Sequence, residues 1–101
     1  MVVRNIDVPK DRIAEFCRRH HLRKLALFGS VLREDFRPDS DIDVLVEFDP
    51  AHVPGFNVID IEDELSRILG GRKIDLVSWK YLNRHLRDRV MASLEVLHDE
   101  G

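Results

Sequence analysis

Three aspartates stand in or next to segments that otherwise have the composition of buried β-strands. Asp41 and Asp43 are two residues apart in the run D-I-D-V-L-V-E-F, so both side chains project from one face of a strand. Asp75 interrupts a second apolar run, K-I-D-L-V. A carboxylate beside a core is costly unless a cation, a donor or a proton satisfies it. Because hard cations such as Mg²⁺ take oxygen ligands, the three acids predict a divalent-metal site.

Each of these acids alone also has an ordinary explanation. A single D-x-D is usually a solvated strand start, and Asp41 follows the turn-forming run R-P-D-S, so it could be only a turn residue. An acid inside a buried strand is rarer, and this sequence has two, Asp43 and Asp75. The pair favours a site over a solvated strand start.

The pair Gly29-Ser30 supplies a second part of the pattern. It follows the apolar run Leu25–Phe28, which is typical of a buried strand. Gly29 lets the backbone approach a ligand closely, and the Ser30 hydroxyl with N–H groups at a helix start would suit phosphate. By itself, Gly-Ser after a strand is more often an ordinary turn with an N-cap. The turn, ten intervening residues, two carboxylates and a third carboxylate on a later strand together indicate a joint site.

The elements that must position these residues alternate between helix and strand. Pro9 with Asp11 favours a helix start, and Gly70-Gly71 marks a helix end. Three strands covered by helices are the economical arrangement for such a chain. In order, the predicted elements are helix Lys10–His20, strand Leu25–Phe28, a helical turn Val31–Asp35, strand Asp41–Phe48, helix Asn57–Leu69, strand Ile74–Val77 and a long helix through Leu82, Leu86, Val90, Leu94 and Leu97.

The composition predicts one globular domain spanning residues 1–101. The chain has 16 Lys and Arg against 19 Asp and Glu, a net charge of −3 and 44% hydrophobic residues. These values argue against disorder and against non-specific nucleic-acid binding. Cys17 is the only cysteine, which excludes an internal disulfide, and it is expected in the core. No apolar run approaches the roughly 18 residues of a membrane helix, and no signal-peptide pattern opens the chain, so we expect a reduced, cytoplasmic protein with no membrane contact.

Aromatic and basic residues outside this pattern have structural explanations. Trp79 and Tyr81 follow the third strand, where packing is the expected use, although either could stack on a base. The basic run from Arg18 to Lys24 is expected to cap the C-terminus of a helix, where cations are favoured. Four residues are expected on the solvated face of the last helix: Arg84, His85, Arg87 and Arg89.

Gly29-Ser30, ten further residues and D-I-D resemble the signature of the DNA polymerase beta-like nucleotidyltransferase superfamily. The wider run L-F-G-S-V-L-R-E-D-F-R-P-D-S-D-I-D-V-L-V-E-F is similar to the minimal nucleotidyltransferase (MNT) family of small bacterial and archaeal proteins, and the resemblance spans nearly the whole chain. It implies an α+β nucleotidyltransferase fold, with helices packed against a small mixed β-sheet. Members commonly occur beside a HEPN-domain protein as the antitoxin of a toxin–antitoxin pair. They can transfer AMP from ATP to a tyrosine of the toxin.

The resemblance implies metal-binding and catalytic roles for the three acids. Asp41 and Asp43 match acids that share two Mg²⁺ ions as ligands. Asp75 matches the third acid, which usually serves the metal near the attacking hydroxyl. Two such ions can lower the pKa of that hydroxyl and stabilise the leaving pyrophosphate. The sequence contains no further substrate-gripping domain, so we expect a partner to deliver the acceptor.

The resemblance also implies nucleotide-binding roles around the turn. Gly29 and Ser30 would contact the triphosphate of ATP. Arg33 stands where the family often has arginine and would touch phosphate. An ion pair of Arg33 with Asp35 or Asp39 is an equally open alternative.

Three classes of function remain open on the sequence. The leading hypothesis is a Mg²⁺-dependent nucleotidyltransferase that adenylylates a partner HEPN toxin, as a homo-oligomer or in a hetero-oligomer with the toxin. The alternative is a non-catalytic antitoxin that neutralises the toxin by steric binding. The acids favour the enzyme, because a pure inhibitor has no reason to keep buried carboxylates. A nucleic-acid-binding regulator is the third class, and the net charge of −3 counts against it.

Overall fold

The computed structural model describes residues 2–3, 6–34, 36–37, 39–52 and 58–100. None of the helices within these ranges is both long enough and apolar enough to cross a membrane. Along the chain the elements are β1 (Val2–Val3), β2 (Ile6–Asp7), α1 (Lys10–Arg19), β3 (Leu22–Phe28), the 3₁₀ turn η1 (Gly29–Leu32), β4 (Ile42–Phe48), η2 (Pro50–His52), α2 (Val58–Ile68), β5 (Ile74–Ser78), η3 (Trp79–Tyr81), α3 (Arg84–Met91) and β6 (Glu95–Asp99).

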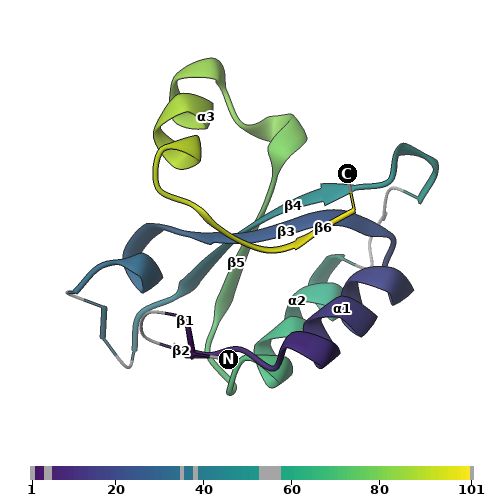
Figure 1. The fold of residues 1–101 in the computed structure, drawn as a ribbon, viewed down its shortest axis with the longest axis horizontal. Helices are drawn as coiled ribbons and strands as arrows, with labels where there is room; N and C mark the ends of the chain where they lie inside the picture. The colour runs from purple at the N-terminus through teal and green to yellow at the C-terminus, as the bar shows by residue number, and fades with distance from the viewer. Residues whose placement is uncertain (1, 4–5, 35, 38, 53–57, 101) are drawn as a thin grey trace.

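A four-stranded mixed sheet in the order β5-β4-β3-β6 forms the centre of the fold (Figure 1). β3 pairs antiparallel with both β4 and β6, whereas β4 and β5 are parallel. Parallel neighbours need a crossover connection, and α2 lies on the one between β4 and β5. β1 and β2 form a separate two-stranded sheet that was not predicted. The predicted α+β class with a small mixed sheet is confirmed.

The two faces of the sheet are covered unequally. α1 and α2 lie together on one face, and α3 stands over the other (Figure 1). Leu45 of β4 packs with Ala26 and Val90 in a small cluster on the α3 side. This alternation confirms the predicted strand, which begins one residue after Asp41. Three alternate side chains of β4 point instead into the larger core cluster, as predicted: Ile42, Val44 and Val46.

The helix α1 follows its predicted pattern closely. Ile13, Phe16 and Cys17 recur at helical spacing and are buried in the larger core cluster. The helix ends at Arg19, one residue before the predicted end at His20. Burial raises the pKa of the Cys17 thiol to about 12, so this cysteine is a protonated core residue, as expected.

The helix α2 buries one face and ends where the sequence indicates. Its last turn is followed by Gly70 and Gly71, which both have positive φ angles, and Gly71 N donates to Ser66 O at 2.8 Å. The predicted start at Asn57 lies outside the described residues, and α2 is described from Val58. The buried face consists of Ile61, Leu65 and Ile68.

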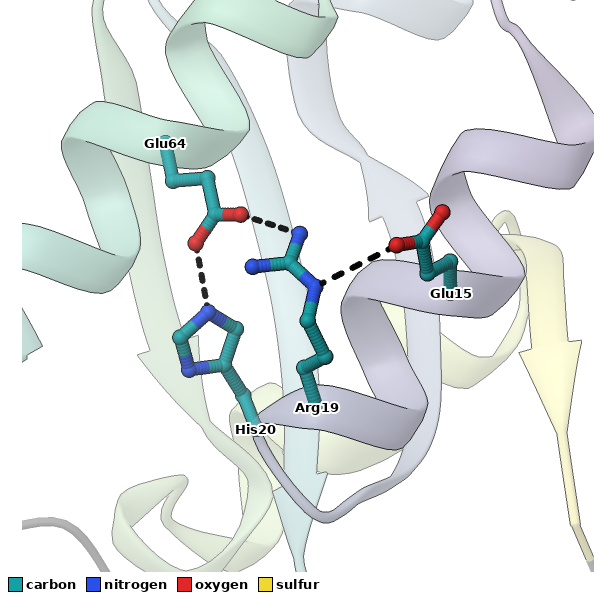
Figure 2. A network of polar contacts seen from close by, with 4 residues as sticks. All are labelled: Glu15, Arg19, His20 and Glu64. Atoms are coloured by element: carbon teal, nitrogen blue, oxygen red, sulfur yellow. Dashed lines mark hydrogen bonds and ion pairs between the residues drawn. The ribbon is translucent and has the colours of Figure 1, made fainter.

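A polar network joins the end of α1 to α2 (Figure 2). Glu64 of α2 pairs with Arg19, and its Oε2 lies 2.6 Å from His20 Nε2. Arg19 also faces Glu15, with 3.7 Å between Nε and Oε1. Burial acts to raise the pKa of Glu64, but hydrogen bonds from His20 and Arg19, together with their charges, lower it. Glu64 therefore holds the two helices together in its ionised form.

The C-terminal segment differs from the single long helix that the spacing predicts. α3 ends at Met91, and the chain then forms β6, which pairs with β3 so that Val96 lies opposite Ala26. Leu94 packs on the α3 side of the sheet, whereas Leu97 packs against the larger cluster on the opposite side. A continued helix would leave the edge of β3 unpaired, and backbone groups on a strand edge need partners.

Several other element boundaries differ from the predicted ones by a few residues. β3 begins at Leu22 and not at Leu25, so Arg23 and Lys24 of the basic run lie in a strand and do not cap a helix. β5 extends one residue beyond its predicted end, to Ser78. The short turn is η1, which starts at Gly29 and not at the predicted Val31. It ends at Leu32, before the predicted end at Asp35, because the backbone of Arg33 is already extended.

Candidate active site

Three segments far apart in the sequence meet at one end of the sheet: the end of β3, the start of β4 and the start of β5. In the parallel pairing of β4 with β5, Asp43 lies opposite Asp75, and in the pairing of β3 with β4 it lies opposite Phe28. Ile42 N donates to Lys73 O at 2.9 Å, which extends the pairing to the strand starts. Asp43 and Asp75 are therefore lateral neighbours on one face of the sheet.

Gly29 has a contact that explains why no larger residue stands there. Its φ angle is +76°, a conformation that L side chains rarely adopt. A Cβ built on Gly29 would also overlap the Asp43 carboxylate, whose Cγ would lie 3.1 Å away. The turn after β3 and the carboxylate on β4 therefore touch. This contact joins the two halves of the pattern found in the sequence.

The environment of Asp43 disfavours its ionised form. Partial burial raises its pKa, and the charges of Asp75 and Asp41 raise it further, while Arg33 acts in the opposite direction. Like charges placed close together disfavour ionisation, and a cation bound among them would reverse that effect. The electrostatics at Asp43 therefore favour a bound cation at this end of the sheet.

The other two acids are less buried than the sequence predicts. Asp41 and Asp75 are exposed, and no charged or polar residue is buried within the described parts of the chain. The prediction that Asp75 lies inside a buried strand was wrong, because β5 is an edge strand. Asp41 precedes β4, in agreement with the alternative that it is a turn residue. The Asp41 carboxylate lies 4.0 Å from Lys73 Nζ. Across the described ranges, no three His, Cys, Asp or Glu side chains are grouped closely enough to hold a metal ion.

The nucleotide-binding candidates lie around η1. Ser30 is half-buried, and its carbonyl oxygen accepts a hydrogen bond of 2.9 Å from Arg33 N, which closes the turn. The Arg33 side chain is exposed, and its charge acts on Asp43. One of the proposed ion-pair partners of Arg33, Asp35, lies outside the described residues. Each of the sequence-predicted site residues therefore lies at or next to this end of the sheet.

Two cavities within the described part of the chain lie away from this end of the sheet. One of about 730 Å³ adjoins the far ends of β4 and β5 and is lined in part by Phe48, Ser78 and Trp79. Another, of about 240 Å³, lies between the sheet and α3, beside Leu45 and Met91. Neither includes the Gly29 turn or the three acids. An ATP-binding cleft at the end of the sheet with the three acids stays a prediction.

The aromatic residues after β5 have different environments. Trp79 packs with the α3-side cluster, as predicted, and the Arg87 guanidinium lies 5.1 Å from its ring centroid. Tyr81 is 79% exposed, so the expectation that it packs was wrong. Arg87 is half-buried and not on a solvated face, because it donates to Trp79 O at 3.3 Å. The other three residues of that predicted face are exposed: Arg84, His85 and Arg89.

Two charged residues near the acids were not identified from the sequence. Lys73 pairs with Asp41, and its position directly before I-D-L-V was the available signal. Glu62 of α2 has a raised pKa, through burial first and then through the charges of Asp75 and Asp63, with Lys73 opposing. Its proximity to Asp75 depends on how α2 packs, which local spacing does not reveal.

The family model described as polymerase beta, nucleotidyltransferase matches residues 11–100. The chain belongs to this family. The matched residues contain the Gly29 turn and all three acids, so the site geometry lies wholly within the nucleotidyltransferase domain.

Curated relatives extend over most of the chain. The protein adenylyltransferase MntA of Thermococcus cleftensis is 38% identical over 81 residues, 79% of each chain. A candidate protein adenylyltransferase of Methanocaldococcus jannaschii is 29% identical over 87 residues, 86% of this chain and 91% of the relative. The nucleotidyltransferase domain of this chain is therefore similar to proteins named as adenylyltransferases.

Solved structures support the fold. A candidate minimal nucleotidyltransferase is 30% identical, with a TM-score of 0.71 over 85% of this chain and 86% of that chain. A toxin–antitoxin structure with AMP-PNP gives a TM-score of 0.72 at 20% identity, over 91% of this chain and 74% of that chain. A complex of tri-AMPylated Shewanella oneidensis HEPN toxin with MNT antitoxin gives 0.63 at 21% identity, over 89% and 69%. The nucleotidyltransferase fold predicted from the sequence is confirmed.

Proposed function

We propose that the chain is a Mg²⁺-dependent nucleotidyltransferase that transfers AMP from ATP to a tyrosine hydroxyl of a partner HEPN-domain toxin, and so acts as its antitoxin in the cytoplasm. The observation that carries the proposal is the contact between the Gly29 turn and the Asp43 carboxylate, with Asp75 in register beside it. This contact supports one site in which phosphate and metal are held together.

Each residue of the site has a role suited to its environment. Asp41, Asp43 and Asp75 would hold two Mg²⁺ ions, which would neutralise charge on the triphosphate and lower the pKa of the acceptor hydroxyl. Gly29 and Ser30 would position the triphosphate through backbone N–H groups and the serine hydroxyl, and Arg33 would add a phosphate contact. Asp75 is exposed on an edge strand, which leaves room for an acceptor from another molecule.

The reaction requires the chain mainly to position the reacting groups and to neutralise charge. The acceptor oxygen forms a bond to the α-phosphorus of ATP, and pyrophosphate leaves as the bond between the α- and β-phosphates breaks. Phosphoryl transfer is catalysed mostly by alignment and charge neutralisation. A small domain with three acids beside a phosphate turn has the groups for both tasks.

The similar proteins support a protein, and in particular a HEPN-domain toxin, as the acceptor. Proteins named as adenylyltransferases align with most of this chain, and one structural neighbour contains AMP-PNP. Another neighbour is a complex in which the HEPN toxin is tri-AMPylated and bound to an MNT antitoxin. These likenesses support a HEPN-domain partner as the substrate of this chain.

A transfer assay with a HEPN-domain protein as the acceptor tests the proposal. Labelled ATP and Mg²⁺ should place AMP covalently on the partner, and Asp43→Asn should lower the rate about 100-fold or more, the scale of losing one electrostatic contact to the transition state. Asp88→Asn removes an exposed acid from α3 and is the matched control, expected at the wild-type rate. Equal rates for all three proteins would contradict the metal role of Asp43.

Neutralisation of the toxin in cells separates catalysis from steric binding. Folded Asp41→Ala and Asp43→Ala variants should fail to protect cells, whereas Ser30→Ala should lose less, because backbone N–H groups would still hold phosphate. If both acid variants protect as well as the wild type, the chain neutralises its partner by binding alone.

A further inference from the structure

Tyr81 is the only tyrosine of the chain, and its side chain is 79% exposed. It closes the turn η3, directly after β5. Trp79, at the start of the same turn, packs against the α3-side cluster. Aromatic rings usually gain stability from burial, so a ring left this open is available to another molecule. The turn is anchored by Trp79 while the phenol faces solvent.

A positive charge lies beside the Tyr81 ring. Lys80 Nζ lies 5.9 Å from the Tyr81 ring centroid, and Lys80 itself is exposed. The opposite end of the sheet carries Asp75 at the start of β5, with Asp41 and Asp43 at the start of the neighbouring β4. An ammonium group beside the phenol is complementary to that acidic end, and to a triphosphate bound there. Lys80 of one copy is therefore complementary in charge to the acids of another copy.

Tyr81 cannot reach the acids of its own copy. Asp75 is at the start of β5 and Ser78 at its end, so at about 3.3 Å per residue the strand alone separates them by about 10 Å before η3 begins. Figure 1 shows the segment between β5 and α3 at the far end of β5 from the strand's start. Transfer to Tyr81 must come from another molecule.

We propose that Tyr81 is an AMP acceptor for the active site of a second copy of this chain. The phenolic oxygen forms a bond to the α-phosphorus of ATP held by that copy, the bond to the β-phosphate breaks, and pyrophosphate leaves with the electron pair. The phenolic proton passes to water. The product is a tyrosine–AMP phosphodiester, and ATP is the only co-substrate. The inference rests on the proposed adenylyltransferase function.

Two complementary variants of the full chain test it. Asp43→Asn keeps Tyr81 but loses a metal ligand, and Tyr81→Phe keeps the site but lacks the acceptor oxygen. Each alone, with ATP and Mg²⁺, should show no AMP on residue 81 by peptide mass spectrometry. Mixed together, they should place AMP on Tyr81 of the Asp43→Asn chain only. The wild-type rate per chain should rise in proportion to protein concentration, and Lys80→Met should lower it several-fold.

The partner assay makes the outcomes distinguishable. Tyr81→Phe should adenylylate the HEPN partner at the wild-type rate, because Tyr81 lies far from the acids. If the partner is modified and the mixed variants leave Tyr81 unmodified, or modify another residue, the proposal for Tyr81 is overturned and the proposed function stands. If neither protein receives AMP, both are overturned.

Discussion

At the scale of single residues, Gly29 is the position where backbone and site meet. Gly29→Ala should lower the free energy of unfolding by about 1–2 kcal/mol for the positive φ alone, and it should also displace the Asp43 carboxylate. Gly70→Ala is the matched control, since Gly70 also has a positive φ (+90°) but a Cβ added there would have no other atom within 4 Å. Urea unfolding should show a loss in both variants. Only Gly29→Ala should lose AMP transfer, and equal activity in the two would argue against a site at the turn.

The raised pKa of Asp43 makes the stability of the fold depend on pH through the candidate site. Because its pKa is raised, first by burial and then by Asp75 and Asp41, the folded state binds the proton more tightly than the unfolded state. Its ionisation therefore weakens folding as the pH rises from about 4, the usual carboxyl range, through the raised value. Asp43→Asn should raise the Tm of the metal-free protein at pH 7, by an amount that shrinks toward pH 4.

Scanning fluorimetry across this pH range measures the effect. Asp41→Asn is the comparison variant: it removes one of the charges that raise the pKa of Asp43 but also loses the contact with the Lys73 ammonium 4.0 Å away, so its gain in Tm should be smaller. Mg²⁺ with ATP should raise the Tm of the wild type, by linkage, and not that of Asp43→Asn. If Mg²⁺ and ATP leave the Tm of the wild type unchanged, an acidic metal site is contradicted.

At the scale of elements, Glu64 controls how α1 and α2 are joined (Figure 2). Its pKa is lowered, since the hydrogen bonds and charges of His20 and Arg19 outweigh burial, so its stabilising contribution is present above the usual carboxyl range and is lost as the pH falls through the lowered value. Glu64→Gln should cost about 1 kcal/mol at pH 7 and less toward pH 3. Glu15→Gln, at a more exposed partner of Arg19, should cost almost nothing in the same urea titrations. Equal losses in both would show that Glu64 has no special role.

The sequence predicted elements well where the deciding contacts are local. The alternation in β4 and the buried stripe of α1 repeat with the period of their own element, so both were recognisable. β6 was missed because its partner strand lies about 70 residues earlier, with Val96 opposite Ala26, while its leucine spacing also fits a helix. At the site, the D-x-D face was predictable, but the exposure of Asp75 follows from the edge position of β5, which only the assembled sheet reveals.

At the scale of the whole molecule, the unequal cores predict unequal local stability. The α3 side of the sheet has a small buried cluster that includes Val90, whereas α1 contributes Ile13 and two other residues to a much larger one. Amides of α3 should therefore exchange with deuterium through local opening, well before those of α1. Val90→Ala should accelerate exchange in α3 about tenfold and leave α1 unchanged, while Ile13→Ala should accelerate both. Equal protection of the two helices in the wild type would contradict this division.

The edge position of β6 has a consequence for biosynthesis. β3, β4 and β5 precede residues 95–99 in the chain, so a polypeptide without β6 has the strands that carry Asp43 and Asp75 while β3 keeps an open edge. An unpaired edge of apolar residues is a template for wrong pairing with other chains. Synthesis of β6 thus closes this edge of the sheet, and a polypeptide that stops before β6 would be the form most exposed to aggregation and chaperone capture.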